Sequence, residues 1–161
     1  DIDWDFFKRS PEEEKAFWGI YDLMDKTHLR RAMPPVDQYA FAVIKELQDH
    51  GNVVEIVTRN TPAAGKSISD WMFMHGVNIR VKTMGRAGGA VGAKAKLRYD
   101  IFVDDSPLLI EPILQHPTKR LILLTAPWNV TGVKPIPKGR NVYRANDWLE
   151  VRRILDALGA L

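Results

Sequence analysis

The chain has 161 residues, of which 45% are hydrophobic and 27% are charged, values typical of one globular domain with a substantial core. It contains no cysteine, which excludes disulfides, thiolate zinc sites and a cysteine nucleophile. The 23 basic and 20 acidic residues leave a net charge of +3, which suits a phosphorylated small molecule and does not favour nucleic acid as a partner. No segment approaches the roughly 18 apolar residues of a membrane span, and no apolar leader opens the sequence. We therefore expect a soluble, cytoplasmic protein without a membrane partner.

The first seven residues are three aspartates, three aromatic residues and one isoleucine. If they form the end of a strand, Asp1 and Asp3 lie on the same side of it, because side chains alternate along extended backbone. The alternative is an acidic terminus without regular structure. Ser10 then precedes Pro11 and three glutamates, a pattern that predicts an N-cap and a helix over residues 11–25.

Strand and helix signals alternate through the rest of the chain. Gly, Ala and Lys are frequent over residues 82–96, which we interpret as a basic loop that enters a short helix. The alternation predicts a three-layer α/β domain with a mostly parallel sheet. Apolar periodicity predicts helices over 36–50, 63–76, 108–115 and 147–158, and β-branched runs predict strands over 53–57, 77–81, 101–103, 121–124 and 141–144.

Polar residues follow several of these predicted strands. The apolar run over residues 101–103 ends in Asp104 and Asp105, and adjacent carboxylates at the carboxyl edge of a sheet favour a divalent cation with oxygen ligands. The alternative is a solvated turn in which Asp and Ser cap the next helix. Thr58, Arg59 and Asn60 follow the strand over 53–57, while Trp128 and Asn129 follow the strand over 121–124 and either line a site or close a loop.

Gly65, Lys66 and Ser67 match the last three positions of a phosphate-binding loop of the nucleoside triphosphatase type. That pattern requires a glycine five positions before Gly65, where Asn60 stands instead. The match to this class of site is therefore weak.

The ordered set of motifs resembles the haloacid dehalogenase-like (HAD) phosphohydrolase superfamily, and within it the 5′(3′)-deoxyribonucleotidase-like family. The resemblance covers nearly the whole chain. The matching pieces, in order, are Asp-Ile-Asp at residues 1–3, Glu-Ile-Val-Thr-Arg-Asn at 55–60, the lysine at 94, Asp-Ile-Phe-Val-Asp-Asp-Ser-Pro at 100–107 and Leu-Leu-Thr-Ala-Pro-Trp-Asn at 123–129.

The resemblance implies a single domain over residues 1–161, with a Rossmann-like α/β/α core and a small helical cap over residues 8–34. It implies a Mg²⁺-dependent phosphomonoester hydrolase that acts on a nucleoside monophosphate through an aspartyl-phosphate. Asp1 would be the nucleophile and Asp3 the acid/base, with Thr58 and Lys94 stabilising the phosphoryl oxygens. Mg²⁺ would be held by Asp1, Asp3, Asp104 and Asp105, and the substrate would contact Arg59, Asn60, Trp128 and Asn129.

Several alternatives stay open. Trp4 and Asp5 stand where the family has glycine followed by threonine or valine, so Asp3 and Asp5 are an alternative catalytic pair. Lys96 is a rival to Lys94. A polynucleotide-end phosphatase and a non-catalytic binding module with the same fold are the alternative functions.

Overall fold

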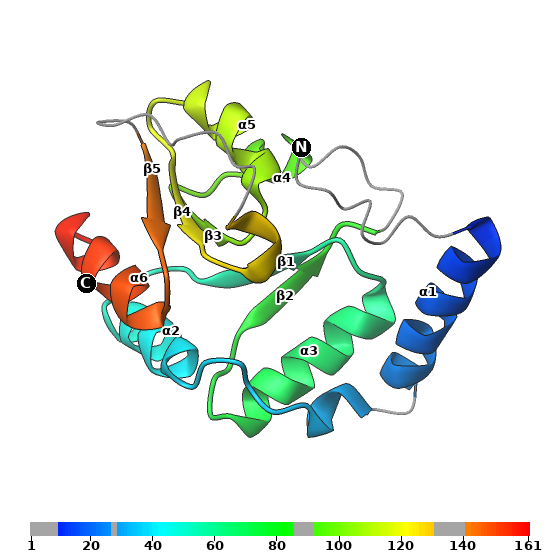
Figure 1. Cartoon of the computed structure of the whole chain (residues 1–161). Helices are drawn as coiled ribbons and strands as arrows, with labels where there is room; N and C mark the ends of the chain where they lie inside the picture. The colour runs from blue at the N-terminus through cyan, green and yellow to red at the C-terminus, as the bar shows by residue number, and fades with distance from the viewer. Residues whose placement is uncertain (1–9, 27–28, 86–91, 131–140) are drawn as a thin grey trace. The chain divides into compact units, whose positions relative to one another are not determined.

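The structure is a computed structural model that describes residues 10–26, 29–85, 92–130 and 141–161. Every strand pairing among these residues is parallel. The chain divides into two compact units, one of residues Phe7–Gly88 and the other of Asp1–Phe6 with Gly89–Leu161 (Figure 1). Both units combine parallel strands with helices, so the α/β class predicted from the alternation of elements is confirmed.

The Phe7–Gly88 unit is built around a strand–helix–strand element. Strand β1 (Glu55–Thr58) pairs with β2 (Arg80–Thr83), and helix α3 (Pro62–Met74) connects them and packs on β2. The hydroxyl of Thr61 accepts a hydrogen bond from the Ala64 amide at 3.3 Å and caps the start of α3, where a proline occupies the first turn.

The predicted cap segment contributes helix α1 (Pro11–Lys26) and the 3-10 helix η2 (Leu29–Ala32), and both pack against α3. The indole nitrogen of Trp71 on α3 donates to the carbonyl of Met33 at 2.8 Å and ties the end of this segment to the unit. Helix α2 (Tyr39–Asp49) follows. Gly51, just beyond its C-cap, has a φ of 80°, the left-handed conformation that glycine adopts readily.

Gly65 of α3 lies close to Thr83 of β2. A Cβ atom at this position would lie 2.5 Å from the Cγ2 of Thr83. We expect Gly65→Ala to destabilise the protein by about 1–2 kcal/mol, although alanine is the better helix former. In a Thr83→Ser background, which lacks Cγ2, the same substitution should cost less than half as much, as measured by denaturant unfolding. Equal costs in the two backgrounds would contradict this close packing.

The second unit contains a three-stranded sheet in the order β3-β4-β5. Its strands are β3 (Ile101–Asp104), β4 (Arg120–Leu124) and β5 (Val142–Ala145). Its helical segments are α4 (Gly92–Ala95), η3 (Pro107–Leu109), α5 (Ile110–Leu114), η4 (Pro127–Asn129) and α6 (Trp148–Ala157), of which α5 and α6 both pack against β4 and β5.

Strand β4 is the centre of this unit. Leu121, Ile122 and Leu123 have no exposed surface, although successive side chains point to opposite faces of the sheet. Leu121 shares a core cluster with Phe102 of β3 and Ile113 of α5. Burial on both faces is the property expected of a parallel strand covered by helices.

The boundaries of some elements differ from those predicted. The strand predicted over residues 77–81 begins at Arg80, because Val77 and Ile79 are buried before the strand pairing starts. The strand predicted over residues 53–57 begins at Glu55, and Val53 is 84% exposed. An apolar side chain predicts that a residue is buried. The boundaries of a strand depend instead on which backbone amides and carbonyls form hydrogen bonds with a neighbouring strand.

Candidate functional site

Asp104 is the last residue of β3 and lies at the carboxyl end of this parallel strand. Its Oδ2 accepts from the ammonium of Lys94 on α4 at 2.8 Å, and its Oδ1 accepts from the backbone amide of Ser106 at 2.8 Å. The Ser106 bond closes the turn after the strand. Both carboxylate oxygens therefore have fixed partners, and the orientation of the side chain is determined.

The Lys94–Asp104 pair is shielded from solvent, with the two side chains 19% and 12% exposed. Charge-assisted hydrogen bonds in such surroundings are stronger than those on an open surface, and removal of one partner leaves the other charge without compensation. The pair holds an ammonium group in a defined position at the strand end, where it can neutralise negative charge on a bound oxyanion. Lys96, the rival lysine, is exposed.

Asp105 is half-buried, and its backbone carbonyl accepts a hydrogen bond from the side-chain amide of Asn129 at 2.8 Å. Two of the four predicted metal ligands, Asp104 and Asp105, are thus adjacent at the end of β3. The other two, Asp1 and Asp3, lie outside the described residues, as does the alternative residue Asp5. Within the described ranges, no three His, Asp or Glu side chains come close enough together to hold a metal ion.

Asn129 has no exposed surface, and its carboxamide is fully used by the protein. Its Nδ2 donates to the carbonyls of Asp105 and Leu124, each at 2.8 Å. Its Oδ1 accepts from the Ala126 amide at 2.9 Å and from Arg144 Nη1 at 3.4 Å. The side chain joins the turn after β3 to the end of β4, and a direct hydrogen bond to a substrate would require one of these bonds to be given up. Trp128 precedes Asn129 in η4.

Arg144 is a cation at this sheet edge that the sequence did not point to. Its guanidinium donates to the carbonyl of Asn129 at 3.2 Å and to the hydroxyl of Thr125 at 3.4 Å. The one feature of the local sequence that could have indicated Arg144 is its charge, which stands near the end of the otherwise uncharged strand β5. Arg144 therefore completes the hydrogen bonding of the β4 end from the neighbouring strand.

The remaining predicted residues lie in the Phe7–Gly88 unit. Thr58 ends β1, and its hydroxyl oxygen accepts from the side-chain amide of Asn60 at 3.0 Å and from the Asn60 backbone amide at 3.3 Å. The hydroxyl hydrogen of Thr58 is still available as a donor. Arg59, between them, is exposed. The structure thus brings Thr58 and Asn60 together in one unit, and Lys94 with Asp104 in the other.

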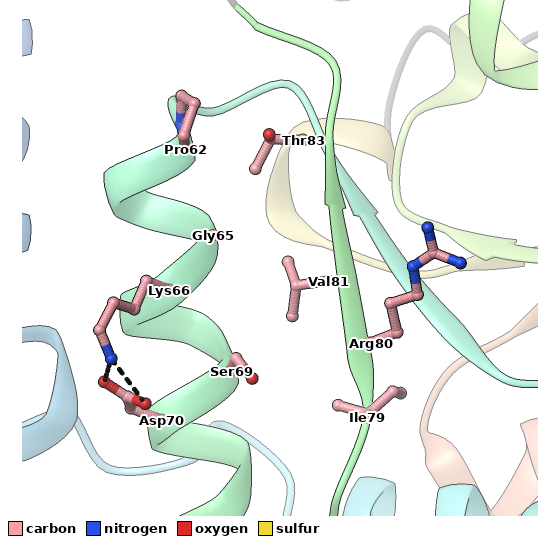
Figure 2. A pocket seen from close by; sticks show the side chains of 9 residues that line it. All are labelled: Pro62, Gly65, Lys66, Ser69, Asp70, Ile79, Arg80, Val81 and Thr83. Atoms are coloured by element: carbon pink, nitrogen blue, oxygen red, sulfur yellow. Dashed lines mark hydrogen bonds and ion pairs between the residues drawn. The ribbon is translucent and has the colours of Figure 1, made fainter.

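The cavity in Figure 2 is an open groove of about 500 Å³ between α3 and β2. Val81 and Thr83 point toward α3, while Lys66 and Asp70 form an ion pair on the helix, with 3.1 Å between Nζ and Oδ2 (Figure 2). Thr58 and Lys94, the predicted catalytic residues that the structure describes, do not line this groove. We therefore place the candidate chemistry at the carboxyl end of β3, where charged groups are held in defined positions.

Gly65, Lys66 and Ser67 do not form a phosphate-binding loop. They lie within helix α3, after its first turn, and Ser67 is buried. Gly65 packs closely against Thr83, and Lys66 forms a surface ion pair with Asp70. The weak match of this segment to a phosphate-binding loop is therefore not borne out by the structure.

Comparisons of the chain with protein-family models, with curated proteins and with solved structures gave no match. Among the described residues, the helices are too short or too polar to cross a membrane.

Proposed function

We propose that this chain is a Mg²⁺-dependent phosphomonoester hydrolase of the HAD-like type, with a nucleoside monophosphate as its substrate. The observation that carries the proposal is the Lys94–Asp104 pair, with 2.8 Å between Nζ and Oδ2, at the carboxyl end of a parallel strand. Phosphoryl transfer needs a fixed cation beside carboxylates that bind a metal, and these residues occur in the order of the HAD-like motifs. A three-layer core with residues 8–34 as its cap belongs to the same proposal.

In the proposed reaction, the carboxylate of Asp1 attacks phosphorus while the alcohol leaves with a proton from Asp3. Water then attacks the aspartyl-phosphate, gives a proton to Asp3 and releases inorganic phosphate. Thr58 donates a hydrogen bond to a phosphoryl oxygen, and Lys94 neutralises the charge that develops on the group in the transition state. Arg59 is exposed and suits a contact with a further part of the substrate.

The donor set suits Mg²⁺, because Asp104 and Asp105 supply two adjacent carboxylates and the ion prefers oxygen ligands. Asp1 and Asp3 complete the proposed ligands. When bound, Mg²⁺ neutralises the negative charges of the substrate and the carboxylates that surround it. The chain holds Asp104 ready for this role through Ser106 and Lys94.

The proposal is tested by incubating the protein with p-nitrophenyl phosphate and with a panel of nucleoside 5′- and 3′-monophosphates in the presence of Mg²⁺. We expect phosphate release that stops on chelation and returns when Mg²⁺ is added. Asp104→Asn should lower turnover by at least about 10²-fold. Asp100→Asn, the same change at an exposed residue just before the same strand, should leave turnover unchanged.

A well-folded sample that hydrolyses none of these compounds would refute the hydrolase and leave a binding module. Equal activity of the two variants would remove Asp104 from the site. Turnover confined to oligonucleotides with a terminal phosphate, together with binding that weakens steeply with salt, would favour the polynucleotide-end phosphatase.

A further inference from the structure

Helix α4, which carries Lys94, has only four residues, Gly92–Ala95. A single helical turn is not stable on its own in water, because nucleation fixes several backbone dihedrals for one hydrogen bond. The position of Lys94 must therefore be determined by contacts from elsewhere in the fold. One such contact is Ala95, which is fully buried in the core cluster.

The second contact comes from Lys119, which lies just before β4. Its ammonium donates to the backbone carbonyls of Ala95 at 2.5 Å and Leu97 at 2.6 Å. The last carbonyls of a helix have no intrahelical partners and favour a positive charge. The same ammonium lies 5.6 Å from the centre of the Phe102 ring, within the range of a cation–π interaction.

Lys119 is itself held firmly against the sheet. Its backbone amide donates to the carbonyl of His116 at 3.0 Å, and its carbonyl accepts from the side-chain amide of Asn141 at 2.7 Å. The next residue, Arg120, donates from its backbone amide to the carbonyl of Asp100 at 2.8 Å, directly before β3. Lys119 therefore connects the end of α4 to the sheet that contains Asp104.

We propose that Lys119 is the positioning residue for Lys94: it binds the carboxyl end of α4 and thereby sets the distance between the Lys94 ammonium and Asp104. Its effect on catalysis rests on the proposed function, whereas its effect on the Lys94–Asp104 pair does not. Asp104 fixes the position of the Lys94 ammonium, and Lys119 fixes the position of the backbone segment that carries Lys94. Both are required for a cation in a fixed place.

The contrasting role is a purely structural one, in which Lys119 stabilises the unit and leaves Lys94 in place. The two roles differ in what happens to the Lys94 ammonium in a folded variant. An ion-paired, shielded ammonium reacts slowly with acylating reagents, because it must first leave its partner and lose a proton. The neighbouring Lys96, exposed in the same segment, provides an internal reference.

The experiment is pulse acetylation of the whole protein with N-hydroxysuccinimide acetate, with the rate at Lys94 measured relative to Lys96 by peptide mass spectrometry. In Lys119→Met the relative rate at Lys94 should rise about tenfold, because α4 loses its charged anchor and opens more often. Lys119→Arg keeps the charge and several donors, and it should restore most of the protection. If Lys119→Met does not fold, Lys119→Gln, which keeps a neutral donor, should show a smaller rise.

An unchanged relative rate at Lys94 in a folded Lys119→Met or Lys119→Gln protein would overturn the proposal, as would a rise in Lys119→Arg equal to that in Lys119→Met. The kcat for p-nitrophenyl phosphate gives the second measurement, expected to fall in Lys119→Met and to recover in Lys119→Arg. If the native protein shows no turnover, the proposed function fails. The acetylation rates still decide whether Lys119 positions Lys94.

Discussion

Lys94→Met is expected to lower kcat/KM for a phosphomonoester by about 10²–10³-fold, whereas Lys96→Met leaves it within about twofold. The two lysines are two residues apart, yet one is paired with Asp104 at 2.8 Å and the other is exposed. Methionine keeps much of the length and apolar body of lysine and removes the charge together with the hydrogen bond to Asp104. The comparison therefore measures the contribution of an ammonium that is paired with Asp104, against one that is exposed.

The kinetic form of the loss carries further information. If Lys94 acts chiefly on charge that develops in the transition state, kcat falls and KM changes little. A rise in KM alone would mean that the ammonium binds the ground-state substrate. Equal losses in Lys94→Met and Lys96→Met, with both variants folded by circular dichroism, would contradict the assignment of the site to Lys94.

Asn129→Asp is expected to destabilise the protein by about 3–4 kcal/mol at neutral pH. The change keeps the shape of the side chain but replaces the NH₂ group, which donates to the carbonyls of Asp105 and Leu124, with a second acceptor. It also places a charge where the native residue has no exposed surface. Denaturant unfolding measures the loss, and Asn78→Asp, the same change at an exposed residue, should cost less than about 0.5 kcal/mol.

Most elements of the fold were predictable because their signals are local. Ser10 and Pro11 marked the start of α1, and the alternation of apolar runs gave the order of strands and helices. Boundaries were less predictable, as at Val77 and Ile79, because the burial of a side chain and the pairing of its backbone are separate properties. The division into two compact units has no signature in the composition.

Lys94 and Asp104 belong to motifs that the sequence displays, and the structure pairs them. The hydrogen-bonding roles of Lys119, Asn129 and Arg144 could not be predicted, although Asn129 itself lies in a motif from which a substrate contact is expected. Their roles depend on hydrogen bonds to residues that are distant in the sequence. The partners lie 22–24 positions from Lys119, 24 positions from Asn129 in the case of Asp105, and 15–19 positions from Arg144. Such bonds follow from the packing of separate elements, and no local pattern encodes them.

Lys94 and Asp104 are separated by ten residues along the chain. The pair closes a short loop, and short loops lose little configurational entropy when their ends meet. Bringing Lys94 to Asp104 therefore costs little chain entropy, and the further requirement for a fixed ammonium is that Lys119 and the core hold α4 in place.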